Sequence, residues 1–240
     1  MGPSSPVSGS PHSSPLPEQF SDEEERDWFI SMAEQGSYTM VTKLFNETLL
    51  SPEDKGKALS GAILGWGGYN PLLEERKQIA TLLLSSQTQP IESRDIGNLL
   101  VEMMQWRHSD ELVALLITSA KDRILPEDAG RAVVAVVKRE YGLFNKTADL
   151  LLDQLGDRLS SAYILMALSF ATKKYDDAVR SKPDCVETYA KIIDRLHALL
   201  HIAKSTDPRA ELQAIFELFK SQKAHIDRDS AHLTHQPGKI

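Results

Sequence analysis

Cys185 is the only cysteine of the 240-residue chain, and a cysteine thiolate can act as a nucleophile or bind a metal ion. The neighbouring Asp184 carries a negative charge that opposes thiolate formation, and the nearest cation in sequence, Lys182, lies across Pro183. We therefore interpret Cys185 as a structural residue. A single cysteine also excludes a disulfide within the chain and favours a reducing, cytoplasmic setting.

Histidines offer a second possible chemistry, because neutral imidazole binds transition metals. His197 and His201 are four residues apart, which places both on one face of a helix, but no third ligand accompanies them. His225, His232 and His235 lie in or beside a segment without helical periodicity. The sequence contains no glycine-rich phosphate loop, no dinucleotide fingerprint, no His-Glu-x-x-His and no Gly-x-Ser-x-Gly. We expect no metal, no cofactor and no enzymatic activity.

Four aromatic residues are the best candidates for binding a partner. Trp66, Tyr69, Trp106 and Tyr141 fall just past the first helix of successive predicted helical units, so stacking of the units would bring them into a row. Trp and Tyr supply a large contact area at low entropic cost and dominate interface hot spots. The alternative interpretation is that these rings pack the junctions between units.

The net charge of −7 limits the kind of partner. An acidic chain repels phosphate backbones, and no run of five or more Lys and Arg offsets this repulsion. The longest apolar run, Ala162–Leu168, is much shorter than the roughly 18 residues of a membrane span. We therefore expect another protein with a basic surface as partner, and neither nucleic acid nor a membrane span. The oligomeric state stays open.

The elements that must position these residues are helices. Apolar residues recur at spacings of three and four, as in Leu112, Leu115 and Leu116, and no segment clearly alternates between apolar and polar residues. Residues 1–20 are rich in Ser and Pro, and we expect them to form a disordered leader. Residues 227–240 lose periodicity and are expected to form a flexible tail.

A repeated pattern organises the helices. The stretches SPEDKGKAL and LPEDAGRAV, beginning at Ser51 and Leu125, share a proline and acids that mark a helix start. Counted from a reference acid, which is Asp54, Asp95 or Asp128, a glycine follows at the second position and apolar residues at the fifth and eighth. The reference acid thus fixes a common frame for three successive first helices.

The same frame gives the length of the unit. Each full copy is followed by a second apolar cluster, beginning at Ile79, Leu112 or Thr147. The unit is about 33 residues long, with an eight-residue insertion near Gly67–Glu74 in the first full copy. A period of this length made of two helices predicts a stacked helical array, because a lone hairpin cannot bury both of its faces.

The N-terminal copy, ISMAEQGSYTMVTKLF at Ile30–Phe45, carries a family resemblance. Its frame of Ala33, Gly36, Val41 and Leu44 resembles the core of an ankyrin repeat. In that family Ala packs the first helix against its neighbour, Gly ends that helix, and Val and Leu line the second helix.

The resemblance covers about residues 25–180 and implies an all-α fold, a helical-hairpin repeat array over residues 21–180. A degenerate fourth copy retains only the stretch ALSFATKKYDDAV, with Ala171 and Val179. The Thr-Pro-Leu-His signature and the Asp-Gly or Asn-Gly tips are absent, so we expect an ankyrin-like solenoid without clear β-fingers. A tetratricopeptide or HEAT-like array is the alternative fold.

We predict a C-terminal pair of helices in residues 181–226, with the first helix starting at Asp184. Val186, Tyr189 and Ile192 run down one face of its first helix. Such a pair would cap the exposed last face of the array. The alternative interpretation is a helical pair that itself binds a partner.

These features predict a protein–protein interaction module or adaptor that uses an elongated helical surface. An unfolded leader before degenerate ankyrin-like helices resembles a bacterial effector, exported into the cytoplasm of a host cell. One alternative is a regulatory scaffold in a eukaryotic cell, controlled by phosphorylation of Ser5, Ser10 and Ser14, each followed by proline. The other is an enzyme with a cryptic helical active site around Cys185.

Overall fold

The computed structural model describes residues 22–65, 72–105, 109–139, 145–202 and 213. Within these residues the chain is all-helical and has no strand, which confirms the predicted all-α class. In chain order the described elements are α1 (Asp22–Glu34), α2 (Tyr38–Glu47), α3 (Pro52–Leu64), α4 (Leu73–Ser85), α5 (Ser93–Gln105), α6 (Asp110–Ala120), the 3-10 helix η1 (Lys121–Arg123), α7 (Pro126–Lys138), α8 (Asn145–Leu155), η2 (Gly156–Arg158), α9 (Ser161–Ser181), η3 (Pro183–Cys185) and α10 (Val186–Ile202).

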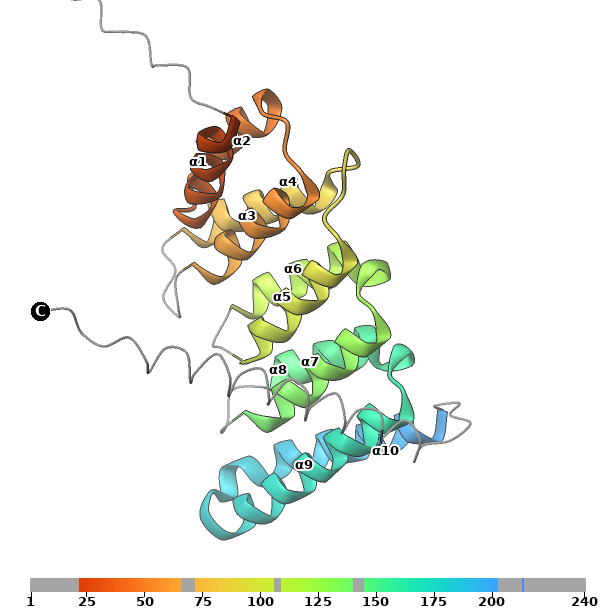
Figure 1. Ribbon diagram of the computed structural model, residues 1–240. Coiled ribbons are helices and arrows are strands. Elements are labelled where there is room, and N and C mark those ends of the chain that lie inside the picture. The colour runs from red at the N-terminus through yellow and green to blue at the C-terminus, as the bar shows by residue number, and fades with distance from the viewer. Residues whose placement is uncertain (1–21, 66–71, 106–108, 140–144, 203–212, 214–240) are drawn as a thin grey trace, which may run out of the picture.

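Consecutive helices pair as hairpins, and the hairpins follow one another along an elongated molecule (Figure 1). Helices α1, α3, α5, α7 and α9 pack each against the next, and we call them the first row. Helices α2, α4, α6, α8 and α10 do the same in a second row. Each first-row helix also contacts the second-row helix that follows it in the chain, so every hairpin inside the stack has a neighbour on both sides.

Local sequence signals start α3 and α7 where the sequence predicts. At α3 the Ser51 hydroxyl oxygen accepts a hydrogen bond from the Asp54 amide at 3.1 Å. The Asp54 carboxylate in turn accepts one from the Ser51 amide at 3.0 Å. This capping box satisfies two amides that the first helical turn leaves without partners. Pro52 and Pro126 open α3 and α7, where the missing amide hydrogen costs nothing.

Four first-row helices carry the same buried pattern. Residues at the fourth, fifth and eighth positions after Asp54, Asp95 and Asp128, and after Tyr163 on α9, are apolar and buried. They are Ala58, Leu59, Ala62, Leu99, Leu100, Met103, Ala132, Val133, Val136, Ala167, Leu168 and Ala171. Full burial of one Val or Leu side chain contributes roughly 1.5–3 kcal/mol, so this pattern supplies much of the stabilisation of the first row.

Basic side chains hold the connections between hairpins. Lys55 on α3 is buried, and its ammonium group donates to two backbone carbonyls and one hydroxyl in the segment after α4. Arg123 donates to the carbonyl of Ile91, and Arg158 donates to the carbonyl of Lys121 one hairpin later. These cations donate hydrogen bonds to carbonyl groups in or beside the connections between hairpins.

Gly36 and Arg76 stabilise the C-terminal ends of helices in the first two hairpins. Gly36 follows the last turn of α1 with a φ of +75°, a left-handed conformation that glycine adopts without strain. Arg76 on α4 is 1% exposed, and its guanidinium group donates to the carbonyls of Glu34 and Ala62, both at 2.6 Å. One buried cation therefore caps the C-terminal turns of both α1 and α3.

The last described hairpin differs from the predicted fourth copy. The ankyrin frame assigns Ala171 and Val179 to two helices, whereas both lie on α9, which is unbroken over 21 residues. This helix contains neither Gly nor Pro, so nothing in its sequence interrupts it. It packs against α10, which begins at Val186 after a 3-10 turn and not at Asp184.

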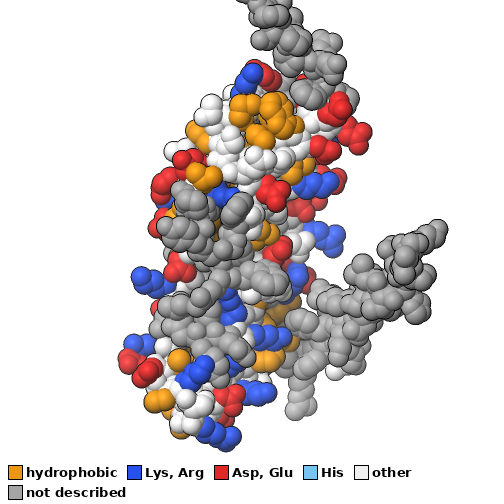
Figure 2. Space-filling model, turned by 90° about the vertical axis from the view of Figure 1, so that its left-hand side faces the viewer, with side chains coloured by type: hydrophobic (Ala, Val, Ile, Leu, Met, Phe, Trp, Pro, Cys, Tyr) orange, Lys and Arg blue, Asp and Glu red, His pale blue; other side chains and the backbone are white. Residues whose placement is uncertain are grey.

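Figure 2 shows charged side chains of both signs along one face, with hydrophobic side chains gathered near the end that α1 and α2 form. Trp28 on α1 and Leu49 after α2 are exposed at this end of the molecule. No helix in the described part of the chain has the length and apolar character that crossing a membrane requires.

Some predictions fall on residues that the structure does not describe. The leader at residues 1–20, the tail at 227–240 and, apart from Gln213, the second helix of the predicted C-terminal pair lie outside the described ranges. The boundaries drawn there stay predictions.

Candidate functional site

A groove of about 600 Å³ lies between α3 and α5. Four carboxylates and one ammonium group line it, together with small, polar and apolar side chains. We call it the acidic groove, and its lining residues are Glu53, Gly56, Lys57, Ser60, Glu92, Asp95, Asn98, Leu99 and Glu102.

The acidic groove carries an unbalanced negative charge. Its one cation, Lys57, is paired with Glu53 at 2.8 Å. Glu92, Asp95 and Glu102 form no ion pair with another described residue, so the lining has a net charge of −3. The described lining offers negative charge and hydrogen-bond acceptors, together with the Ser60 hydroxyl group. Such a site attracts Lys and Arg side chains.

The first-row helices approach one another where each reference residue lies over a glycine of the preceding helix. The distance from a Cβ atom placed on the glycine to the nearest atom of the next helix shows how close this approach is. Its nearest neighbour would be Asp95 at 3.1 Å from Gly56, Asp128 at 2.0 Å from Gly97 and Tyr163 at 2.3 Å from Gly130. Of these three junctions, only α3–α5, which contains the acidic groove, leaves nearly enough room for a methyl group.

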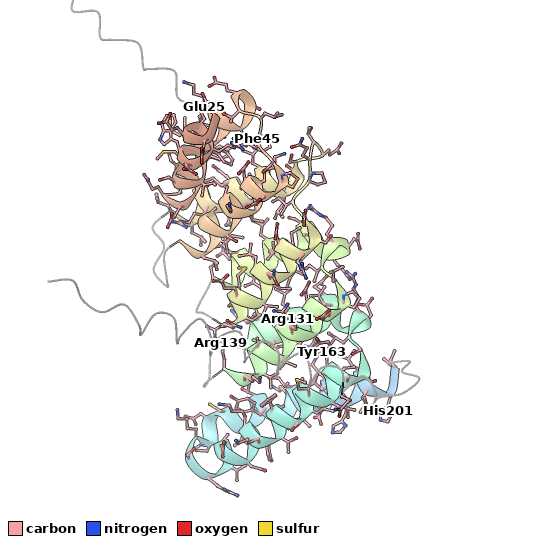
Figure 3. All side chains as sticks on the ribbon, in the orientation of Figure 1. Glu25, Phe45, Arg131, Arg139, Tyr163 and His201 are labelled. Carbon is pink, nitrogen blue, oxygen red and sulfur yellow. The ribbon has the colours of Figure 1, made fainter. Side chains whose placement is uncertain are left out.

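A second groove, of about 270 Å³, lies between α5 and α7. Three cations and no carboxylate occur among the described residues around its apolar floor, which gives this described lining a net charge of +3. We call it the basic groove, and its lining residues are Val101, Gln105, Arg131, Val134, Ala135, Lys138 and Arg139. Figure 3 shows Arg131 on the body of α7 and Arg139 at its C-terminal end. The Lys138 ammonium group lies 4.4 Å from the centroid of the Phe170 ring, a cation–π contact with α9.

Both grooves open on the same face of the molecule. Asn98, Glu102 and Gln105 are exposed, and their spacings of four and three place them in one stripe along α5. Asn98 and Glu102 border the acidic groove, and Gln105 borders the basic groove. Arg131, at the rim of the basic groove, donates to the Asn98 side-chain oxygen at 3.3 Å. The stripe is therefore a ridge between two grooves of opposite charge.

Buried polar groups hold the junctions on either side of α7. Asp128 is 5% exposed and forms an ion pair with Arg131 at 3.0 Å. Burial raises the pKa of the Asp128 carboxyl above its ordinary value, and the Arg131 charge opposes this rise. Burial, with a smaller contribution from the charge of Glu127, raises the pKa of Tyr163 to about 12. Tyr163 lies between α7 and α9 (Figure 3) and stays a neutral packing group at physiological pH.

The aromatic anchors predicted from the sequence are not part of either groove's described lining. Trp66, Tyr69, Trp106 and Tyr141 all lie outside the described residues. Their arrangement in a row stays a prediction.

The residues considered for chemistry do not converge in the described part of the chain. Cys185 is a free, half-buried cysteine in η3, and His197 and His201 are exposed on α10. The described residues contain no group of three or more His, Cys, Asp and Glu that could hold a metal ion. His225, His232 and His235 lie beyond the described residues.

Sequence reasoning missed both grooves, although a signal for them exists. The third residue after the reference acid is Lys57, Asn98 or Arg131, so the charge beside the acid changes from copy to copy. Asp95 and Glu102 are seven residues apart and therefore share a face of α5. The pairing of this face with α3 follows only from the packing of the helices.

Comparisons with known protein families, with curated proteins and with solved structures find no match for this chain. The functional argument therefore depends on the grooves themselves.

Proposed function

We propose that the chain is a non-enzymatic protein–protein interaction module, built as an ankyrin-like array of helical hairpins without β-fingers. Its acidic groove binds a basic segment of a partner protein. The observation that carries this proposal is the net charge of −3 concentrated around a cavity of about 600 Å³ between α3 and α5. A concave site of one sign raises the local concentration of ligands of the other sign.

The spacing of the carboxylates favours a particular segment. Asp95 and Glu102 are seven residues apart on α5, which corresponds to about 10 Å along a helix. Two residues that are three apart in a peptide of extended polyproline II conformation are separated by about 9 Å and lie on the same side, because this helix has three residues per turn. Lys or Arg at such a spacing would reach both carboxylates, while their methylene stems contact Leu99 in the middle of α5.

The proposed setting is the cytoplasm, either of a host cell that receives the protein as a bacterial effector or of a eukaryotic cell in which it is a regulatory scaffold. Deleting residues 1–19 separates the two settings. Loss of export would favour the effector, and loss of phosphorylation would favour the scaffold.

A labelled peptide tests the groove directly. The probe is a fluorescein-labelled extended peptide with Lys at every third position and Ser between, measured by fluorescence anisotropy. The groove variant combines Glu92→Gln, Asp95→Asn and Glu102→Gln. The control combines Asp122→Asn, Asp157→Asn and Asp176→Asn, which removes the same charge from exposed sites on η1, η2 and α9.

We expect the groove variant to bind the probe at least about tenfold more weakly, because three exposed charge pairs together contribute about 1.4 kcal/mol or more. The control should change the affinity by less than about twofold at ionic strengths near 0.1 M, where charges beyond about 10 Å are screened. Equal losses in the two variants would show that the net charge alone attracts the peptide and would contradict a groove-specific site.

A further inference from the structure

The two grooves are complementary to each other. The acidic groove has a lining charge of −3, and the basic groove has a lining charge of +3, to which Arg131 contributes although it is also paired with Asp128. They lie on opposite sides of one exposed stripe on α5, and both open on the same face. The molecule therefore presents, side by side, a charged surface and the surface that would complement it.

We propose that this face is a self-association surface, on which a second copy of the chain docks about a two-fold axis passing over the α5 stripe. A two-fold rotation about an axis that lies parallel to the face and runs along α5 turns the second copy to face the first and reverses the order of the grooves along the stack. The acidic groove of each copy then meets the basic groove of its partner, and the same contact forms twice, as an isologous interface requires. Like-charged grooves are kept apart in this arrangement, which fixes its orientation.

The position of the grooves favours a closed pair over an open chain. A head-to-tail chain needs two complementary patches that face different neighbours. Here one ridge, formed by Asn98, Glu102 and Gln105, separates the grooves, so a single docked molecule covers both. The occupant of this face is therefore one copy, and association stops at the dimer.

Charge pairing carries most of this contact. The floor of the basic groove is built from Val101, Val134 and Ala135, and Val101 and Val134 are already buried in the single chain. A docked copy therefore gains little further apolar burial, and the rim charges set the orientation and the association rate. Because the rim contacts are exposed, salt should weaken the dimer.

This inference does not depend on the proposed function, but the two interact. A second copy would cover the acidic groove, so a basic peptide and the second copy compete for it. The monomer would then be the form that binds the peptide.

Two charge-reversal variants test the pairing. One variant carries Glu92→Lys and Glu102→Lys, which gives both grooves a positive charge. The other carries Lys138→Glu and Arg139→Glu, which gives both grooves a negative charge. All four changes avoid Asp128 and Arg131, whose buried ion pair supports the fold. A control with Asp122→Lys and Asp157→Lys changes the net charge as the first variant does, at exposed sites away from the grooves.

The measurement is sedimentation equilibrium of the full chain at an ionic strength of about 0.05 M, at concentrations up to about 1 mM. We expect the unchanged chain and the control to form dimers, and each groove variant alone to be at least about tenfold weaker in self-association. An equimolar mixture of the two groove variants should form dimers again, since each positive groove then faces a negative one. Circular dichroism verifies that each variant is folded.

Several results would overturn the proposal. The unchanged chain could remain monomeric throughout, or either groove variant alone could dimerise as the unchanged chain does. The mixture could fail to restore the dimer, or it could give assemblies larger than two chains, which would indicate head-to-tail association. If the dimer is absent while the labelled peptide still binds the acidic groove, the self-association surface fails and the proposed function stands.

Discussion

The α3–α5 and α5–α7 junctions join helices of the same length with glycine at the same position, yet they differ in closeness and charge. α3, α5 and α7 each have 13 residues, and each has glycine as its fifth residue. At the first junction Asp95 lies over Gly56 at the base of an open acidic groove. At the second, Asp128 is buried against Gly97, and the groove beside it is smaller and basic.

The residue three positions after the acid accounts for this difference. Arg131 neutralises Asp128, so that the carboxylate can leave water and the helices can close over it. The corresponding residue of α5 is Asn98, which has no charge to offer Asp95. Asp95 therefore keeps its contact with water, and the helices around it stay apart. One difference in a repeated frame thus separates a packed junction from an open groove.

The largest expected effect is the loss of close approach at the α5–α7 junction. In the variant Gly97→Ala, the new Cβ would lie 2.0 Å from a carboxylate oxygen of Asp128 and 2.7 Å from its Cβ. Because the Cβ of Asp128 follows its backbone, the helices must separate. We expect a net loss of about 2–3 kcal/mol in the free energy of unfolding, after about 1 kcal/mol gained from helix propensity. Urea unfolding followed by circular dichroism measures it, and a stability equal to that of the unchanged chain would refute the close junction.

Much of this row could be predicted from the sequence, because its signals are local. The positions after Asp54, Asp95 and Asp128 repeat in the sequence, and the residues there are buried as the frame requires. Proline and the capping serine likewise act within one helical turn. The unbroken α9 could also be predicted, because its sequence contains neither Gly nor Pro. The ankyrin frame led instead to a prediction of two helices there.

The contacts that the sequence did not reveal join residues far apart in the chain. Arg76 reaches the carbonyl of Glu34, 42 residues earlier, and Lys55 reaches a hydroxyl 31 residues later. The acidic groove likewise needs Glu53 and Glu102 to come from two helices in a particular register. A periodic pattern establishes that helices stack, whereas the side chains that meet across the stack depend on the packing itself.

The next effect in size is the loss of charge neutralisation in the variant Arg131→Asn, which gives α7 the residue found on α5. Asp128 would stay buried without its cation, and we expect a loss of about 1–2 kcal/mol near pH 7. The deficit should shrink as the pH falls. Burial already raises the pKa of Asp128, so protonation stabilises the folded state and removes the cost of the unpaired charge. Urea unfolding of both proteins at about pH 7 and pH 4 measures the difference, and a deficit that grows in acid would contradict this account.

The reciprocal variant, Asn98→Arg, should affect binding more than stability. A guanidinium group three residues after Asp95 would reproduce the pairing of Arg131 with Asp128, but it would lose the hydrogen bond from Arg131 to Asn98. We expect stability to change by less than about 0.5 kcal/mol, as is usual at exposed sites. The affinity for the labelled basic peptide should fall by about threefold or more, since part of the groove charge is neutralised. Asn98→Gln is the control and should bind as the unchanged chain does.

Of the two glycine variants, Gly56→Ala at the open junction should change the stability less. The nearest neighbour of the new Cβ is a carboxylate oxygen of Asp95 at 3.1 Å, the far end of a side chain that borders a groove and can shift. The gain in helix propensity, about 1 kcal/mol, should then outweigh the contact and leave the variant about 0.5 kcal/mol more stable. The methyl group also enters the lining of the acidic groove, so the labelled peptide should bind more weakly even though the folded state is more stable. A loss of stability as large as that of Gly97→Ala would mean that the two junctions are equally close, and the distinction between a packed junction and a binding groove would fail.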